Sequence, residues 1–183
     1  MMKKYFMLLL AFLLVAAIEA VAQERGYRGT VEIGPTMLVS GMEETAFGAT
    51  VYTSHGYQFC PEFFVGVGVG AFGFLNNEAG GVGGIGGVPL YLNLQSYLTR
   101  KDVAPYVDLK VGYALFDYDG LYLSPTVGVQ LLRNERAALR IGLNYSHVGI
   151  RDSYINEQGS RSTDRWYLHW LGLHLGLTFG GRK

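Results

Sequence analysis

Apolar and polar residues alternate one by one along almost the whole chain from residue 27 onward. Residues 165–179 read RWYLHWLGLHLGLTF, and in their second half four leucines alternate with glycine, histidine and threonine. Successive side chains of a β-strand point to opposite sides, so this segment is predicted to be a strand with one apolar face. No stretch after residue 22 has helical periodicity, and Gly, with 26 residues of 183, is a poor helix former. The pattern predicts an all-β fold.

The same alternation predicts eight strands. They are expected at approximately 27–39, 45–59, 62–75, 87–98, 104–116, 120–132, 136–149 and 165–179, with turn-forming or polar residues between them. A strand and its connection about every 20 residues is typical of an antiparallel up-and-down arrangement. Short turns at 60–61, 99–103 and 133–135 are expected at one end, and the longest connections, 76–86 and 150–164, at the other.

Nearly all charged residues of these strands lie on one face. The more apolar face, which is the odd-numbered one except in 87–98, carries no Asp, Glu or Lys, and its one Arg, Arg165, begins the last strand. A soluble barrel needs the reverse, with charges outside and few within. In a bilayer the arrangement is favourable, because a Lys or Arg facing lipid at mid-depth costs about 2–4 kcal/mol whereas charges in the lumen can pair. A soluble secreted barrel is therefore the weaker interpretation.

Strand length and backbone hydrogen bonding complete the fold prediction. The predicted strands exceed the roughly 9–11 residues that a tilted transmembrane strand requires. Backbone groups in lipid must all be bonded, which demands a closed barrel. We therefore predict an eight-stranded antiparallel up-and-down transmembrane β-barrel, with a bulge or local break near Pro35 and near Pro125. Outward aromatic residues are expected to form interfacial girdles, with Phe59, Phe63 and Phe179 at one rim and Phe47, Tyr113, Tyr145 and Tyr167 at the other.

The first 22 residues have the features of a secretory signal peptide. Lys3 and Lys4 precede 14 apolar residues, 5–18, and Ala20-Val21-Ala22 provides a cleavage site before Gln23. A transmembrane anchor is the alternative, but the apolar run falls short of the roughly 20 residues that span a bilayer as a helix. The expected organisation is a signal peptide, 1–22, and a barrel domain, 23–183.

Charged side chains on the inward face are predicted to form a polar network in the lumen. The members are Arg28, Glu32, Asp108, Lys110 and Arg140. An eight-stranded barrel is only wide enough to be filled by its own side chains, so a structural network is expected and a narrow ion pathway is the alternative.

The longest polar connection, 150–164, is the candidate for surface contacts, because long loops usually carry the function of a barrel. Its candidate contact residues are Asp152, Tyr154, Asn156, Glu157, Arg161 and Asp164. A solvated loop without a partner is the alternative reading.

No catalytic, cofactor or metal site is predicted. Residues 144–149, NYSHVG, superficially resemble a lipid A deacylase motif, but Gly149 stands where that chemistry requires a Ser on the same face as His147. Two G-x-G-x-x-G matches, at 68–73 and 81–86, precede no helix and predict no phosphate site. His55, His147 and His169 are expected on the outer face and His174 in the lumen, without ligand spacing. Zero net charge gives no reason to expect nucleic acid.

Several segments resemble the small outer-membrane β-barrel proteins of Gram-negative bacteria, the OmpX/OmpW-like β-barrel group. These are HGYQF at 55–59, FFVGVGVG at 63–70, VPLYLN at 88–93 and APYVDLKVGY at 104–113. The resemblance implies a place in the outer membrane among its lipids and lipopolysaccharide, and insertion by the outer-membrane assembly machinery, with Phe179 as the terminal aromatic. It also implies a non-enzymatic structural or adhesion-like role with an unknown surface ligand, or alternatively a narrow channel or carrier for small hydrophobic molecules or ions.

Overall fold

The computed structural model describes residues 26–40, 46–60, 62–75, 86–99, 101, 103–116, 118–131, 137–155 and 161–180. For 151–155 and 161–165 only the backbone is described. The predicted signal peptide, 1–22, lies outside these residues. No helix in the described part is both long and apolar enough to span a bilayer.

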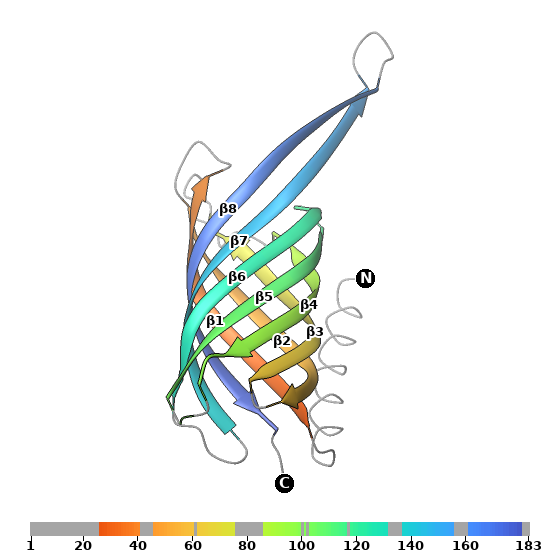
Figure 1. The fold of residues 1–183 in the computed structure, drawn as a ribbon. Helices are drawn as coiled ribbons and strands as arrows, with labels where there is room; N and C mark the ends of the chain where they lie inside the picture. The colour runs from red at the N-terminus through yellow and green to blue at the C-terminus, as the bar shows by residue number, and fades with distance from the viewer. Residues whose placement is uncertain are drawn as a thin grey trace, which may run out of the picture.

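Eight antiparallel strands form one closed barrel in which each strand pairs with its neighbours in the chain. Pairing of the first strand with the last closes the sheet, with Gly29 opposite Phe179 and Met37 opposite Leu171. Figure 1 shows the strands tilted around the barrel axis, with a long hairpin rising at one end. The strands are β1 (Tyr27–Ser40), β2 (Phe47–Cys60), β3 (Phe63–Phe74), β4 (Val88–Tyr97), β5 (Ala104–Leu115), β6 (Gly120–Leu131), β7 (Ala137–Ile155) and β8 (Arg161–Phe179).

The predicted fold class, strand number and order are confirmed, and β1 to β6 differ from the predicted bounds by at most two residues. The prediction was wrong for 150–164, which was expected to be a loop. There β7 continues to Ile155 and β8 begins at Arg161, with Ile155 opposite Arg161. Above a membrane both faces of a strand meet water, so the apolar alternation that reveals a transmembrane strand is absent.

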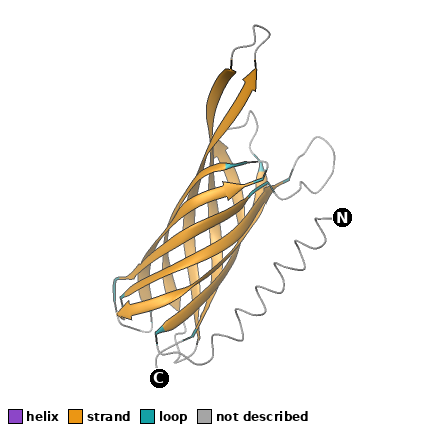
Figure 2. Ribbon diagram, turned by 90° about the vertical axis from the view of Figure 1, so that its right-hand side faces the viewer, coloured by secondary structure: helices purple, strands orange, loops and turns teal. Residues whose placement is uncertain are grey.

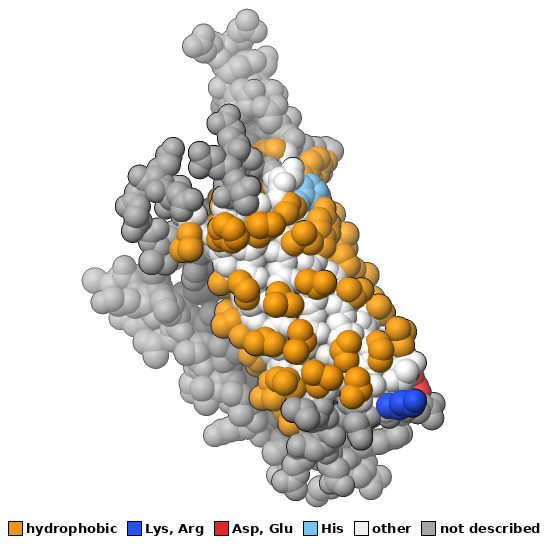
Figure 3. Space-filling view, turned by 90° about the vertical axis from the view of Figure 1, so that its left-hand side faces the viewer, with side chains coloured by type: hydrophobic (Ala, Val, Ile, Leu, Met, Phe, Trp, Pro, Cys, Tyr) orange, Lys and Arg blue, Asp and Glu red, His pale blue; other side chains and the backbone are white. Residues whose placement is uncertain are grey.

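The outer wall is apolar and the lumen contains the polar residues, as predicted. From Val31 onward the odd-numbered residues of β1 are exposed, for example Ile33 at 57%, as are the even-numbered residues in the middle of β4, for example Leu92 at 55%. Glu32 and Asn93, on the opposite face, are buried. Among the strand residues whose side chains are described, no exposed residue is charged. Figure 3 shows the hydrophobic belt that results on one face of the barrel. Such a surface is suited to lipid.

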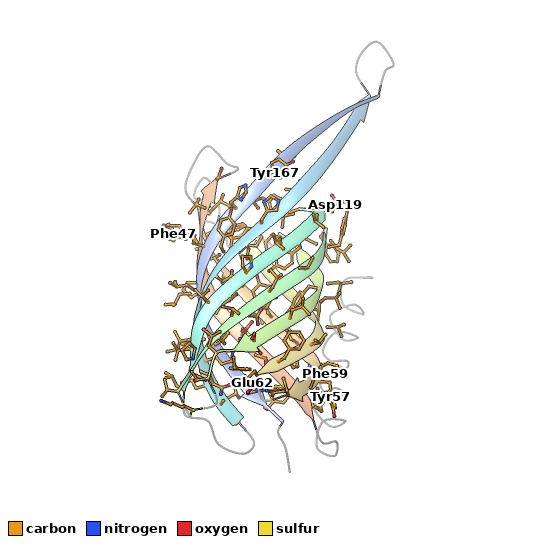
Figure 4. The ribbon with its side chains drawn as sticks, in the orientation of Figure 1. Phe47, Tyr57, Phe59, Glu62, Asp119 and Tyr167 are labelled. Carbon is orange, nitrogen blue, oxygen red and sulfur yellow. The ribbon has the colours of Figure 1, made fainter. Side chains whose placement is uncertain are left out.

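Aromatic residues lie at both ends of the belt. Phe47 and Tyr167 lie towards the end with the projecting hairpin, and Tyr57 and Phe59 lie at the opposite end (Figure 4). The barrel begins and finishes at that opposite end, since Gly29 pairs with Phe179 (Figure 2). The chain therefore enters and leaves the barrel on one side, and the hairpin projects from the other.

Each intrastrand proline interrupts one ladder without shifting it. Pairing between β1 and β8 skips from Ile33 to Thr36 around Pro35, and pairing between β6 and β7 skips from Leu123 to Thr126 around Pro125. The register is the same on both sides of each gap. Of the two expected alternatives, a bulge or a local break, each proline therefore causes a local break. Proline has no N–H to donate, which accounts for the missing pairs.

Candidate functional site

Four charged side chains form an ion cluster at the centre of the lumen. Lys110 Nζ lies 2.8 Å from Glu32 Oε2 and 3.1 Å from Asp108 Oδ1. Arg140 Nη2 lies 3.4 Å from Glu32 Oε1 and 3.3 Å from Asp108 Oδ2. The four side chains are buried and come from β1, β5 and β7. Two cations and two carboxylates make the cluster electrically neutral, which limits the cost of burying it.

Aromatic rings cover the ion cluster on both sides along the barrel axis. Lys110 Nζ lies 5.5 Å from the centre of the Tyr52 ring, which belongs to the apolar cluster nearer the projecting hairpin. The Arg140 guanidinium lies 4.0 Å from the centre of the Tyr106 ring, which packs with Tyr97 at the other end. Both contacts have cation–π geometry. The pairing of these rings with the cations depends on a register that the sequence pattern does not contain.

Arg28, the fifth predicted member of the network, lies nearer the end where the chain enters the barrel. Its guanidinium donates to Gln58 Oε1 at 2.5 Å and to Gln130 Oε1 at 2.9 Å, and lies 4.9 Å from the Tyr97 ring centre. The structure thus brings Glu32, Asp108, Lys110 and Arg140 together in four ion pairs, while the side-chain amides of Gln58 and Gln130 bind Arg28.

Inward glycines provide the room that the lumen rings occupy. A Cβ added to Gly142 would lie 2.5 Å from Tyr106 Oη, and one added to Gly128 would lie 2.7 Å from the Tyr106 ring. Trp170 is fully buried among the rings of the apolar cluster nearer the projecting hairpin. Trp166, on the same face of β8 as Trp170, is instead 37% exposed, because β8 has left the closed part of the barrel there.

Ser146 and His147 lie on opposite sides of the wall. Ser146 is buried and donates to Asn144 Oδ1 at 2.8 Å, and its Oγ lies 3.0 Å from Ser124 Oγ. The Asn144 amide also donates to the Pro125 carbonyl at 3.4 Å, beside the ladder break. His147 lies on the outer side of β7, so it cannot act as the general base that would activate Ser146 as a nucleophile.

An apolar groove of about 600 Å³ lies on the outer wall between the two prolines. It crosses β6, β7, β8 and β1, and Leu143 and Leu173 lie in its middle. It opens toward the lipid-facing side and is separated from the ion cluster by the wall of the barrel.

The projecting hairpin consists of the ends of β7 and β8. The β6–β7 ladder ends at Gly120 opposite Ile150, and the β1–β8 ladder ends at Ser40 opposite His169. Beyond these points β7 and β8 pair only with each other within the described residues. Of the predicted contact residues, Asp152 and Tyr154 belong to β7 and Arg161 and Asp164 to β8, so they are strand residues and not loop residues. Asn156 and Glu157 lie outside the described part of the chain.

Comparison with known proteins bears on the fold. No protein-family model matches the chain, and no curated protein matches it. Neisserial surface protein A (NspA) has a similar structure, with a TM-score of 0.61 and 14% identity over 84% of this chain and 96% of NspA. The outer membrane protein OprG from Pseudomonas aeruginosa has a TM-score of 0.51 and 14% identity over 87% of this chain and 98% of OprG.

A designed transmembrane β-barrel is also similar, with a TM-score of 0.50 and 12% identity over 86% of this chain and 97% of the design. Identities this low establish the fold alone. The chain has the fold of the small eight-stranded transmembrane β-barrels.

Proposed function

We propose that this chain is a non-enzymatic outer-membrane protein whose projecting β7–β8 hairpin makes contacts at the cell surface. The apolar belt and the similarity to NspA and OprG support a place in the outer membrane, among its lipids and lipopolysaccharide. Insertion by the outer-membrane assembly machinery would then follow, with Phe179 on the last strand as its recognition residue.

The observation that carries the proposal is the length of hairpin that extends beyond the closed barrel. From Arg161 to Leu168, β8 pairs with β7 and has no β1 partner among the described residues. Eight residues at about 3.3 Å each extend for about 25 Å. A strand edge with unpaired N–H and C=O groups is a template for an added strand, which is a recurrent way of binding an extended peptide.

The composition of the lumen favours surface contact over conduction. The neutral ion cluster and the rings of Tyr52 and Tyr106 occupy the centre of a barrel that is only wide enough for its side chains. A general channel would need this core to rearrange.

Shortening the hairpin tests the proposal. We would delete residues 153–163 and join Asp152 to Asp164 through an Asn-Gly turn, which keeps the remaining strands in register because the two aspartates are partners. Cells that display the full chain should adhere to surfaces coated with fibronectin, laminin or collagen, and cells with the shortened chain should lose adhesion to whichever coating is bound.

A matched control removes residues 76–85, the other long connection predicted at this end. This variant should adhere as the full chain does. Heat-modifiable migration and surface protease accessibility must show that both variants are folded and present in the outer membrane. Equal adhesion by the full and shortened hairpin would contradict the proposal.

A further inference from the structure

Two histidines and a tyrosine come together on the outer wall of β7 and β8. His147 and His169 are direct cross-strand partners, and Tyr145 is two residues before His147. Tyr167, which stacks on His147, lies towards the end of the barrel with the projecting hairpin (Figure 4). The group therefore lies near one membrane–water interface, where an aqueous ion can reach it.

The polar atoms of this group crowd a single nitrogen. His147 Nδ1 lies 3.3 Å from His169 Nδ1, and Tyr145 Oη lies 2.5 Å from the same His169 nitrogen. A neutral imidazole nitrogen has one in-plane position, which is either an N–H or a lone pair. When His169 Nδ1 bonds to Tyr145 Oη, it therefore has no second in-plane position with which to bond His147 Nδ1.

His55, on the outer side of β2, shows the satisfied arrangement for comparison. Its Nδ1 lies 2.5 Å from Tyr27 Oη, and its Nε2 lies 3.0 Å from Thr53 Oγ1. Each ring nitrogen has its own hydroxyl partner, which can donate or accept as needed. The His147–His169 pair differs, because Nδ1 of His169 is shared between His147 Nδ1 and Tyr145 Oη.

The separation of the two nitrogens matches that of ligands on one metal ion. Two imidazole nitrogens, each about 2.0–2.1 Å from a tetrahedral Zn²⁺, lie about 3.3–3.4 Å apart. The rings are also held in place, since His147 stacks on Tyr167 with 5.3 Å between centroids and His169 stacks on Tyr145 with 5.8 Å. Imidazole is a favourable ligand for Zn²⁺, Cu²⁺ and Ni²⁺.

We propose that Nδ1 of His147 and Nδ1 of His169 bind one transition-metal dication of the Zn²⁺ or Cu²⁺ class on the outer wall of the barrel. The ion takes the place of the hydrogen bond between Tyr145 Oη and His169 Nδ1, and water completes the coordination on the open side. The ion replaces the 3.3 Å hydrogen bond between the two nitrogens and links β7 to β8 just below the projecting hairpin. Sequence alone did not predict the site, because the pairing of residues 147 and 169 depends on the hairpin register.

Metal titration of the refolded full barrel tests this proposal. The protein carries no affinity tag, and Cys60 is changed to Ser, because this exposed thiol is itself a metal ligand. Calorimetry with ZnCl₂ in detergent micelles should give one bound ion per chain, and electron paramagnetic resonance with CuCl₂ should show coupling to two nitrogens. His147→Gln and His169→Gln should each weaken binding by at least about tenfold and reduce the coupling to one nitrogen.

His55→Gln is the matched control and should bind both metals as the parent does. Heat-modifiable migration establishes that each variant forms the barrel, which is expected for changes on the outer wall. The proposal is overturned if the parent binds neither metal, if either His147→Gln or His169→Gln binds as the parent does, or if His55→Gln causes the same loss.

Discussion

Lys110 on β5 reaches across the lumen to Glu32 on β1, with 2.8 Å between Nζ and Oε2. In the closed strand order, β1 and β5 are separated by three strands on either side, so this ion pair spans the barrel. Both side chains are buried. The pair therefore links opposite walls through the centre of the protein.

Removing one member of this pair should destabilise the barrel strongly. Lys110→Met leaves Glu32 and Asp108 with Arg140 as their remaining partner in the cluster, and such uncompensated burial costs about 3–5 kcal/mol. Urea unfolding in lipid vesicles, followed by fluorescence of the buried Trp170, measures the loss. The double variant Glu32→Gln/Lys110→Met restores neutrality and should be more stable than Lys110→Met; equal or lower stability would show that the two charges are not coupled.

The filled lumen predicts that the refolded protein produces no discrete conductance steps in planar bilayers. The ion cluster and its covering rings occupy the path along the axis. Stable single-channel steps from the unaltered protein would contradict this and would favour the channel alternative. A preparation of an open porin, recorded in the same bilayers, establishes that steps can be detected.

Gly142→Ala should lower the free energy of unfolding by about 1–3 kcal/mol, because the added methyl group meets the Tyr106 hydroxyl at 2.5 Å. The cost should decrease in a Tyr106→Phe background, where this oxygen is absent. Gly149→Ala is the control, since its Cβ would have no contact closer than 3.4 Å and should change stability by less than about 0.5 kcal/mol. Equal costs at the two glycines in urea unfolding would argue against the steric explanation.

A charge on the outer wall should be penalised according to its depth. Leu173→Arg, in the middle of the outer-wall groove, should cost about 2–4 kcal/mol when folding is measured in vesicles. Leu98→Arg, which follows β4 at the rim, should cost about 0–1 kcal/mol. If the two variants fold equally well in lipid, the exposed belt is not the lipid-facing surface.

Pro125→Val should close the break in the β6–β7 ladder. The β5–β6 ladder runs through Pro125 without a gap, so the missing donor faces β7. A valine restores this N–H, and one net backbone hydrogen bond contributes about 0.5–1.5 kcal/mol. Amide hydrogen exchange of Leu143 and Tyr145 should become slower, while that of β2 residues stays unchanged. Unchanged exchange at β7 would mean that the proline does not cause the break.

The sequence pattern predicted which side of the wall each side chain occupies, but not which side chains meet. Alternation placed Glu32 and Lys110 in the lumen, since period two follows from strand geometry alone. Their pairing across the barrel depends on the stagger of every ladder between them, and no local pattern encodes that stagger. The cross-strand contact of His147 with His169 could not be predicted for the same reason.

The alternation of apolar and polar residues also stops where β7 and β8 extend beyond the lipid-facing part of the barrel. Below Ile150 the outer face of β7 meets lipid, and the requirement for apolar residues makes the strand visible. Above Ile150 both faces of the strand are largely polar, as in a loop, so the pattern predicts a connection at 151–155 and 161–164 where the structure has strand.

The seam between β1 and β8 has a consequence for how the barrel assembles. Gly29 must find Phe179, a partner at the other end of the barrel sequence, whereas every other ladder joins strands that are neighbours in the chain. Each of the seven ladders between neighbouring strands closes only a short loop of chain. The β1–β8 seam closes a loop that contains the whole domain, so its formation has the largest entropic cost. Until it closes, two bare edges face the membrane interior. Pairing of β8 with β1 is thus the step that closes the barrel, and a truncation that removes β8 leaves a sheet that cannot close.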